Sequence, residues 1–87
     1  MIERVVKIVN PLGIHARPSA SLVKIASKYS DNIDLYCENN KASAKSIMGV
    51  MTLAMAEGVE VRVVVSGNNE VKALEDICNA LTKIYEY

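Results

Sequence analysis

The single histidine of the chain, His15, lies in segment 13–18, whose sequence is GIHARP. Proline is tolerated in the first turn of a helix, because the amide it lacks would have no intrahelical partner there, so Pro18 predicts that a helix is starting. His15 is therefore expected at or next to the N-cap. The first-turn amides, such as those of Ala16 and Arg17, then point outward at the positive end of the helix dipole, where anions bind readily.

An imidazole at this position has nucleophilic chemistry available. Its unperturbed pKa of about 6.5 leaves it largely neutral near pH 7, so a ring nitrogen has a lone pair for attack on phosphorus. The planar cation of Arg17 suits phosphate oxygens. No second general base, carboxylate pair or metal-ligand set accompanies these residues, which favours a carrier over a hydrolase. The alternative from the local pattern is a capping or surface histidine beside a solvated arginine.

A second candidate site is Ser46, which precedes a short helix expected to end near Ala54. Serine is a good N-cap residue, and a phosphate on it would add about −1.5 to −2 charges that a helix N-terminus tolerates. Lys45 beside it could contact the phosphate or could be solvated, and the pattern favours a solvated lysine. The side of the helix expected to pack on the sheet carries Val50, Leu53 and Ala54. The other side carries Ile47, Met48 and Met51. This second group is either an exposed docking patch, for which methionine is suited, or is buried under neighbouring helices.

Strands and one-sided helices alternate along the chain. Strands are predicted over 2–9, 33–38, 41–44 and 59–65, with Asn39-Asn40 as a tight turn. Helices are predicted over 16–29, 46–54 and 70–85. The inward stripe of the last helix is expected to be Val71, Leu74, Ile77, Cys78, Leu81 and Ile84. The order β-α-β-β-α-β-α predicts an α+β two-layer fold, an antiparallel-rich sheet with helices covering one face.

Length and composition narrow the class of protein. The 87 residues predict one domain, 1–87, and its core must be aliphatic because the only aromatic residues are four tyrosines. Ten basic residues balance ten acidic ones, which argues against a nucleic-acid partner. No apolar run approaches the roughly 20 residues of a membrane span, and we expect no secretory signal. Cys37 and Cys78 are expected to be reduced and buried in a cytoplasmic protein, although their spacing leaves a disulfide open. Neither a metal site nor a cofactor is expected.

The sequence resembles the HPr family, the histidine-containing phosphocarriers of the bacterial phosphoenolpyruvate-dependent sugar phosphotransferase system. Segment 13–18 resembles the active-site signature of the family. Segment 45–49, KSIMG, resembles the serine-phosphorylation segment seen chiefly in Gram-positive members. The resemblance runs over essentially the whole chain. It implies an open-faced β-sandwich of four antiparallel strands with three helices on one side, and it favours a functional His15 over a capping one.

The resemblance also implies a function. Enzyme I would phosphorylate Nδ1 of His15 with phosphoenolpyruvate, and the group would pass to sugar-specific IIA proteins, with Arg17 stabilising the phosphohistidine. Docking would use Ala20, Ile47, Met48 and Met51. An ATP-dependent HPr kinase/phosphorylase would modify Ser46, and the product would slow transfer from Enzyme I or act as corepressor for a transcriptional regulator. The chain would be a monomeric carrier and not an enzyme. The alternatives are a regulatory phosphorelay carrier, nitrogen-related or without sugar permeases, and a non-covalent protein-binding module.

The chain departs from the family pattern at two places. Segment 66–70, SGNNE, lacks the acidic residue that many members have ahead of the last helix, and Asn69 is expected to cap that helix instead. Tyr29 stands where many members have phenylalanine. Neither departure involves the residues expected to do chemistry.

Overall fold

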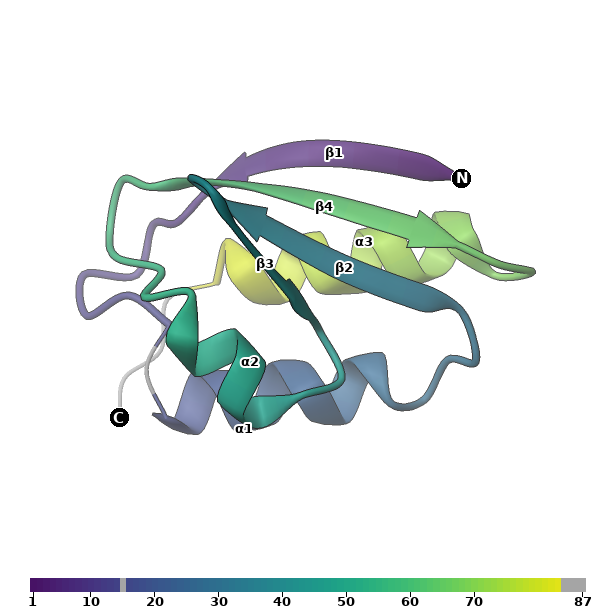
Figure 1. Ribbon diagram of the computed structural model, residues 1–87, viewed down its shortest axis with the longest axis horizontal. Helices are drawn as coiled ribbons and strands as arrows, with labels where there is room; N and C mark the ends of the chain where they lie inside the picture. Colours follow the sequence, from purple (N-terminus) through teal and green to yellow (C-terminus); the bar gives the residue numbers. More distant parts are fainter. Residues whose placement is uncertain (15, 84–87) are drawn as a thin grey trace.

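The structure is a computed structural model that describes residues 1–14 and 16–83. The strands in these residues are β1 (Ile2–Lys7), β2 (Asn32–Cys37), β3 (Asn40–Ser43) and β4 (Glu60–Ser66). The helices are α1 (Ala16–Ala26), α2 (Ile47–Thr52) and α3 (Glu70–Leu81). Their order along the chain is the predicted one (Figure 1). Within the same residues, no helix has the length and apolarity to cross a membrane.

The strands form one antiparallel sheet in the order β1-β4-β2-β3 (Figure 1). In the central strand β4, Val61, Val63 and Val65 are fully buried, as their alternation in the sequence predicts. Every helix of the described residues lies on the same face of this sheet. The predicted fold class, an α+β open-faced sandwich, is confirmed.

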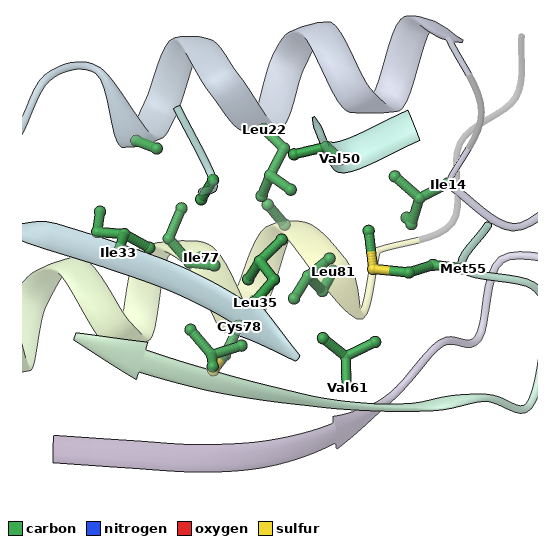
Figure 2. Packing of buried hydrophobic residues seen from close by; sticks show 14 of the residues in the cluster. Ile14, Leu22, Ile33, Leu35, Val50, Met55, Val61, Ile77, Cys78 and Leu81 are labelled. Carbon is green, nitrogen blue, oxygen red and sulfur yellow. The ribbon is translucent and has the colours of Figure 1, made fainter. Parts of the chain in front are cut away.

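The core between sheet and helices is aliphatic, as the composition predicts. Leu22 of α1, Val50 of α2 and Ile77 of α3 point toward Leu35 of β2, and each of the four is at most 1% exposed (Figure 2). Both cysteines are free and buried, as expected. Their burial raises the pKa of each thiol, so both stay protonated at neutral pH.

Several predicted boundaries are wrong by a few residues. Helix α1 ends at Ala26 instead of near Tyr29, because hydrogen bonds from residue 28 to 25 and from 29 to 26 tighten the chain into turns. Strand β1 ends at Lys7, although the amide of Ile8 still donates to the Val59 carbonyl at 2.9 Å. The hairpin turn is one residue earlier than predicted, since Cys37 pairs with Asn40. The predicted end of α3 at Tyr85, and with it Ile84, lies outside the described residues.

Two residues expected in the core lie at the surface. Val71 is 63% exposed, because a helical side chain covers the turn N-terminal to it, and Val71 in the first turn of α3 has no such turn to cover. Ala54 is exposed because α2 has already ended at Thr52. The backbone at Ala54 is left-handed, with φ of 53°, so its side chain does not follow the buried face of the helix.

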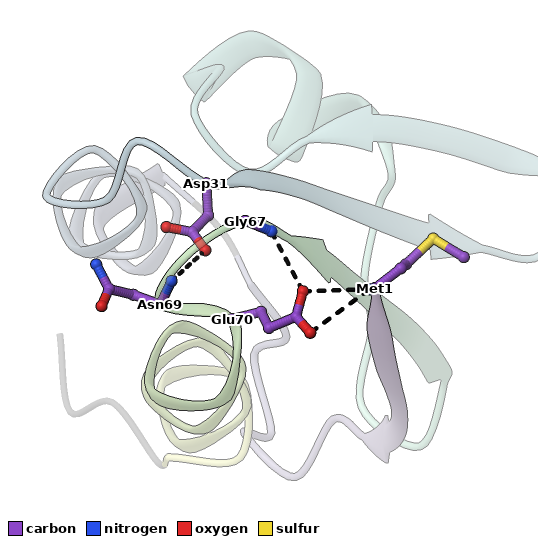
Figure 3. Close-up of polar contacts among 5 residues, drawn as sticks. All are labelled: Met1, Asp31, Gly67, Asn69 and Glu70. Atoms are coloured by element: carbon purple, nitrogen blue, oxygen red, sulfur yellow. Dashed lines mark hydrogen bonds and ion pairs between the residues drawn. The ribbon is translucent and has the colours of Figure 1, made fainter.

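The start of α3 is held by acidic side chains (Figure 3). Asn69 takes the N-cap position of α3, as expected, but its side chain makes no cap hydrogen bond within the described residues. Instead its amide donates to Oδ2 of the buried Asp31 at 2.9 Å. The amide of Gly67 donates to Glu70 Oε2 at 3.2 Å, and the ammonium of Met1 lies 3.2 Å from the same oxygen. The turn is therefore stabilised by Asp31, which precedes β2, as well as by local residues.

Glu70→Gln tests this junction through the pH dependence of stability. The Gly67 amide, followed by the ammonium of Met1, lowers the pKa of the Glu70 carboxyl below its ordinary value. A carboxyl whose folded pKa is lowered stabilises the protein above its unfolded pKa of about 4.3, and that contribution is lost as pH falls through the folded pKa. We expect the wild type to unfold at higher urea than the variant near pH 7, and the difference to shrink below about pH 4. A difference in urea stability between wild type and variant that stays the same at every pH would contradict the contact between Glu70 and the Gly67 amide.

The end of α1 is tied to both other helical regions. The hydroxyl of Tyr29 donates to the Asp76 carboxylate of α3, and this bond raises the pKa of Tyr29 to about 12. Lys45, just before α2, is half-buried and donates from Nζ to the Tyr29 carbonyl at 2.6 Å. The expectation of a solvated Lys45 is therefore wrong, because its ammonium satisfies a main-chain carbonyl at the frayed end of α1.

Candidate functional site

The loop that precedes residue 15 is held by hydrogen bonds on several sides. The Gly13 amide donates to the Asn10 carbonyl at 2.8 Å, and Asn10 Nδ2 donates to the Gly13 carbonyl at 2.6 Å. The Ile14 amide donates to the Met55 carbonyl at 2.8 Å. The Ile14 side chain is 6% exposed and lies beside Met55 at one end of the core (Figure 2). The chain thus reaches residue 15 from a fixed direction.

Helix α1 begins directly after residue 15, as predicted. Ala16 is its first residue and Pro18 its third, and Pro18 is buried. Ala16 and Arg17 are exposed and occupy the first two helical positions, where amides have no carbonyl to bind within the helix. The first turn of α1 holds no acidic residue, so no side chain of that turn cancels the positive end of the helix dipole.

His15 itself lies outside the described residues, and its interpretation as a nucleophile stays a prediction. The described residues establish the two flanks, a tied loop on one side and an exposed helix start on the other. The exposed start of a helix suits the oxygens of a phosphate.

Ser46 is the N-cap of α2, as predicted. Its backbone is extended, and its Oγ accepts a hydrogen bond from the Gly49 amide at 3.0 Å. Its side chain is exposed, so the hydroxyl is also accessible to an enzyme in solution. Capping therefore explains this serine structurally, and phosphorylation stays a prediction.

Comparison with known proteins decides the family. The family model described as "PTS HPr component phosphorylation site" matches residues 2–83. The chain belongs to the HPr family. It is 40% identical over 86 residues to the phosphocarrier protein HPr of Xylella fastidiosa strain Temecula1, covering 99% of this chain and 92% of that protein.

Solved HPr structures share the fold. HPr-C-His from Thermoanaerobacter tengcongensis superposes with a TM-score of 0.88 at 38% identity, over 93% of this chain and 91% of that one. An HPr dimer from the same organism matches with a TM-score of 0.66 at 41% identity, covering 92% of this chain and 95% of that chain. HPr proteins are phosphocarriers of the phosphotransferase system that serves sugar transport, and this chain has their architecture.

Apolar side chains gather on the exposed side of α2. Ile47, Met48 and Met51 are 45%, 77% and 46% exposed, whereas Val50 on the opposite side is fully buried. Of the two readings of the sequence pattern, the exposed patch is confirmed and the buried helix is wrong. Ala20, also exposed, lies one turn after Ala16 on α1, which packs against α2. We call Ala20, Ile47, Met48 and Met51 the α1–α2 patch. Its use in docking stays a prediction.

Three residues that hold the loop have no counterpart among the predicted site residues. Asn10 is fully buried, Met55 is 2% exposed, and Ser19 Oγ donates to the Ile14 carbonyl at 3.4 Å. Asn10 stands before Pro11, and from sequence the pair indicates only a turn. Met55 supports the loop through its main-chain carbonyl. A main-chain group is present at every residue, so the sequence gives no signal of this role.

Proposed function

We propose that this HPr-family chain accepts a phosphoryl group from phospho-Enzyme I on Nδ1 of His15 and transfers it to sugar-specific IIA proteins. The observation that carries the proposal is the GIHARP segment, in which the only imidazole of the chain immediately precedes an exposed helix start. The proposal describes a carrier and not an enzyme, since the phosphoryl group leaves on the next partner.

The chemistry is a direct exchange of bonds. The neutral ring donates its lone pair to phosphorus, the bond between phosphorus and Enzyme I breaks, and that electron pair stays with Enzyme I. The amides of Ala16 and Arg17 and the Arg17 guanidinium would bind the phosphoryl oxygens, which are anionic in both the donor and the product. Transfer to a IIA protein reverses the same steps with a different acceptor. No metal or cofactor is part of this proposal.

The direct test is to mix the chain with Enzyme I and phosphoenolpyruvate and to measure its intact mass. We expect one added phosphoryl group that is lost in acid, as a phosphohistidine would be. After removal of phosphoenolpyruvate, addition of a IIA protein should return the chain to its original mass. An unchanged mass with active Enzyme I would favour a non-covalent binding module. A phosphorylated chain that no sugar-specific IIA protein can discharge would favour a regulatory phosphorelay carrier.

Met48→Glu tests the α1–α2 patch. Met48 is 77% exposed, so the change should leave folding intact while placing a charge where an apolar contact with Enzyme I is proposed. With the chain as the substrate of Enzyme I, we expect KM for the chain to rise at least about 10-fold with little change in kcat, as for loss of a central interface contact. The matched control is Val71→Glu, an equally drastic change at an exposed position of α3. Equal effects of the two variants would contradict docking through the patch.

We propose that Ser46 is the target of an ATP-dependent HPr kinase/phosphorylase and that the modified chain transfers more slowly from Enzyme I or binds a transcriptional regulator. The accessible hydroxyl and its place beside Ile47 and Met48 support this. A phosphate there would keep accepting from the helix N-terminus while placing about −1.5 to −2 charges next to the patch.

Ser46→Ala separates the two roles of this serine. Loss of the Gly49 bond should lower the free energy of unfolding by about 1 kcal/mol, the usual value for an N-cap. Incubation with kinase and ATP should give an acid-stable adduct in the wild type and none in the variant. An adduct that persists in Ser46→Ala would place the modification elsewhere, and unchanged urea unfolding would contradict the cap.

We propose that the chain acts in the cytoplasm as a monomer. A carrier that meets Enzyme I and IIA proteins in turn must keep one face free for both, and a monomer does so. Because one similar HPr has been solved as a dimer, sedimentation equilibrium at micromolar concentration is the measurement to make. A mass of two chains would contradict the monomer without affecting the chemistry of His15.

A further inference from the structure

We infer that Asn10 is a positioning residue for phosphoryl transfer, which fixes the loop that presents His15. The inference rests on the proposed function and adds to it a residue five positions before the acceptor. It follows from the burial of a polar side chain and from the bonds this side chain makes to the loop.

Asn10 is fully buried, with 0% of its surface exposed. A primary amide is costly to bury unless its polar atoms are bonded, so its place in the fold depends on its partners. Its Nδ2 donates to the Gly13 carbonyl at 2.6 Å, and its own carbonyl accepts from the Gly13 amide at 2.8 Å. Residue 10 thus binds both polar main-chain groups of Gly13 and closes the loop that contains the exposed Pro11 and Leu12.

Gly13 extends this constraint to Ile14, the residue before the proposed acceptor. Its φ of +70° turns the chain into Ile14, whose amide, side chain and carbonyl are each held, by Met55, by the core and by Ser19. The next residue is His15, and α1 starts immediately after it. Two of these supports are side-chain bonds, and the Nδ2 bond of Asn10, at 2.6 Å, is shorter than the 3.4 Å bond of Ser19 Oγ. The Asn10 bond can be removed by a side-chain change that leaves the helix start, the core contacts of Ile14 and the α1–α2 patch in place.

Transfer to phosphorus needs the attacking nitrogen in a narrow range of positions, and a displacement of about 1 Å can cost about 10²-fold in rate. A positioning residue and a merely stabilising one therefore differ in what they change. Loss of stability lowers the amount of folded protein and moves no kinetic constant of the folded form. Loss of positioning lowers the kcat of Enzyme I with the folded chain as acceptor and leaves KM for the chain nearly unchanged, because docking uses other residues.

The experiment compares Asn10→Ala with Ile33→Val, which shortens a buried side chain at the opposite end of the core from Ile14 (Figure 2). Both are assayed with phospho-Enzyme I at a temperature where unfolding curves show each fully folded. With Asn10→Ala as the acceptor, we expect kcat of Enzyme I to fall at least about 10-fold and KM for the chain to stay within about two-fold of the wild-type value, whereas Ile33→Val should match wild type. The NMR signals of the single imidazole should shift in Asn10→Ala and stay in place in Ile33→Val.

Equal kcat for Asn10→Ala and wild type would overturn the inference, and so would a rise in KM without a fall in kcat. If Asn10→Ala does not fold, Asn10→Ser is assayed in its place with the same expectations for kcat and KM, and hydrogen exchange in the wild type tests the hydrogen bonds themselves. The side-chain amide protons of Asn10 and the amide of Gly13 should exchange far more slowly than the side-chain amide of the exposed Asn68, and equal rates would overturn the inference. A wild type that accepts no phosphoryl group would instead refute the proposed function. The exchange rates would still test whether Asn10 and Gly13 are held by these hydrogen bonds.

Discussion

His15→Ala is expected to abolish phosphoryl acceptance from phospho-Enzyme I. The chain has no other imidazole, so no second ring nitrogen can take over as acceptor. The loss should be complete at any Enzyme I concentration, because the substitution removes the atom that forms the bond to phosphorus and not an interaction that assists it. Intact mass after incubation with Enzyme I and phosphoenolpyruvate measures it.

The control for this substitution is Ser46→Ala, which keeps the imidazole and removes the other proposed phosphorylation site. It should gain one acid-labile phosphoryl group under the same conditions, as the wild type does. Circular dichroism should show that both variants are folded. An acid-labile adduct on folded His15→Ala would show that another residue is the acceptor and would refute the proposed function.

Gly13→Ala is expected to be the most destabilising single-methyl change in the loop. The backbone of Gly13 has φ of +70°, a conformation that costs an L side chain about 1–2 kcal/mol. A Cβ at this position would also overlap the Met55 carbonyl oxygen, and that oxygen is main chain that already accepts from Ile14. We expect a loss of about 2–4 kcal/mol in the free energy of unfolding, a large part of the 5–15 kcal/mol typical of a domain. Urea unfolding measures it.

Gly58→Ala separates the two contributions. Gly58 also has a left-handed backbone, with φ of +86°, but within the described part of the chain nothing lies within 4 Å of an added Cβ. Its loss should be about 1 kcal/mol, the conformational cost alone. The excess in Gly13→Ala then measures how tightly the loop is packed on Met55. Equal losses in the two variants would contradict that packing.

The sequence predicted the parts of the fold that depend on pattern. The alternation of valines in β4 was sufficient to predict a half-buried strand, and the spacing of Leu22, Ile77 and Leu81 predicted which faces of α1 and α3 meet the sheet. The helix starts were predicted from local chemistry, with Pro18 at the first turn of α1 and Ser46 capping α2. For Ile47, Met48 and Met51 of α2 the sequence left two alternatives, an exposed patch or burial under other helices. The exposed fractions of these side chains decide for the exposed patch.

What the sequence could not predict depends on contacts between distant segments. Asn69 takes the predicted N-cap position of α3, but its side chain makes no cap bond, and its amide donates to Asp31, 38 residues away. Lys45 was expected to be solvated, but it reaches the Tyr29 carbonyl across 16 residues. The support of the loop by the Met55 carbonyl has the same character, since a main-chain group has no sequence signature. Local patterns thus indicated where the candidate site begins, and tertiary contacts determine how it is held.

NMR of the phosphorylated chain tests the central claim most directly. With one histidine, a uniformly ¹⁵N-labelled sample has a single imidazole ring, whose two nitrogens can be assigned without ambiguity. After reaction with Enzyme I and phosphoenolpyruvate, we expect Nδ1 of His15 to show coupling to ³¹P and Nε2 to show none. A chain that has gained a phosphoryl group while both ring nitrogens lack this coupling would contradict the account.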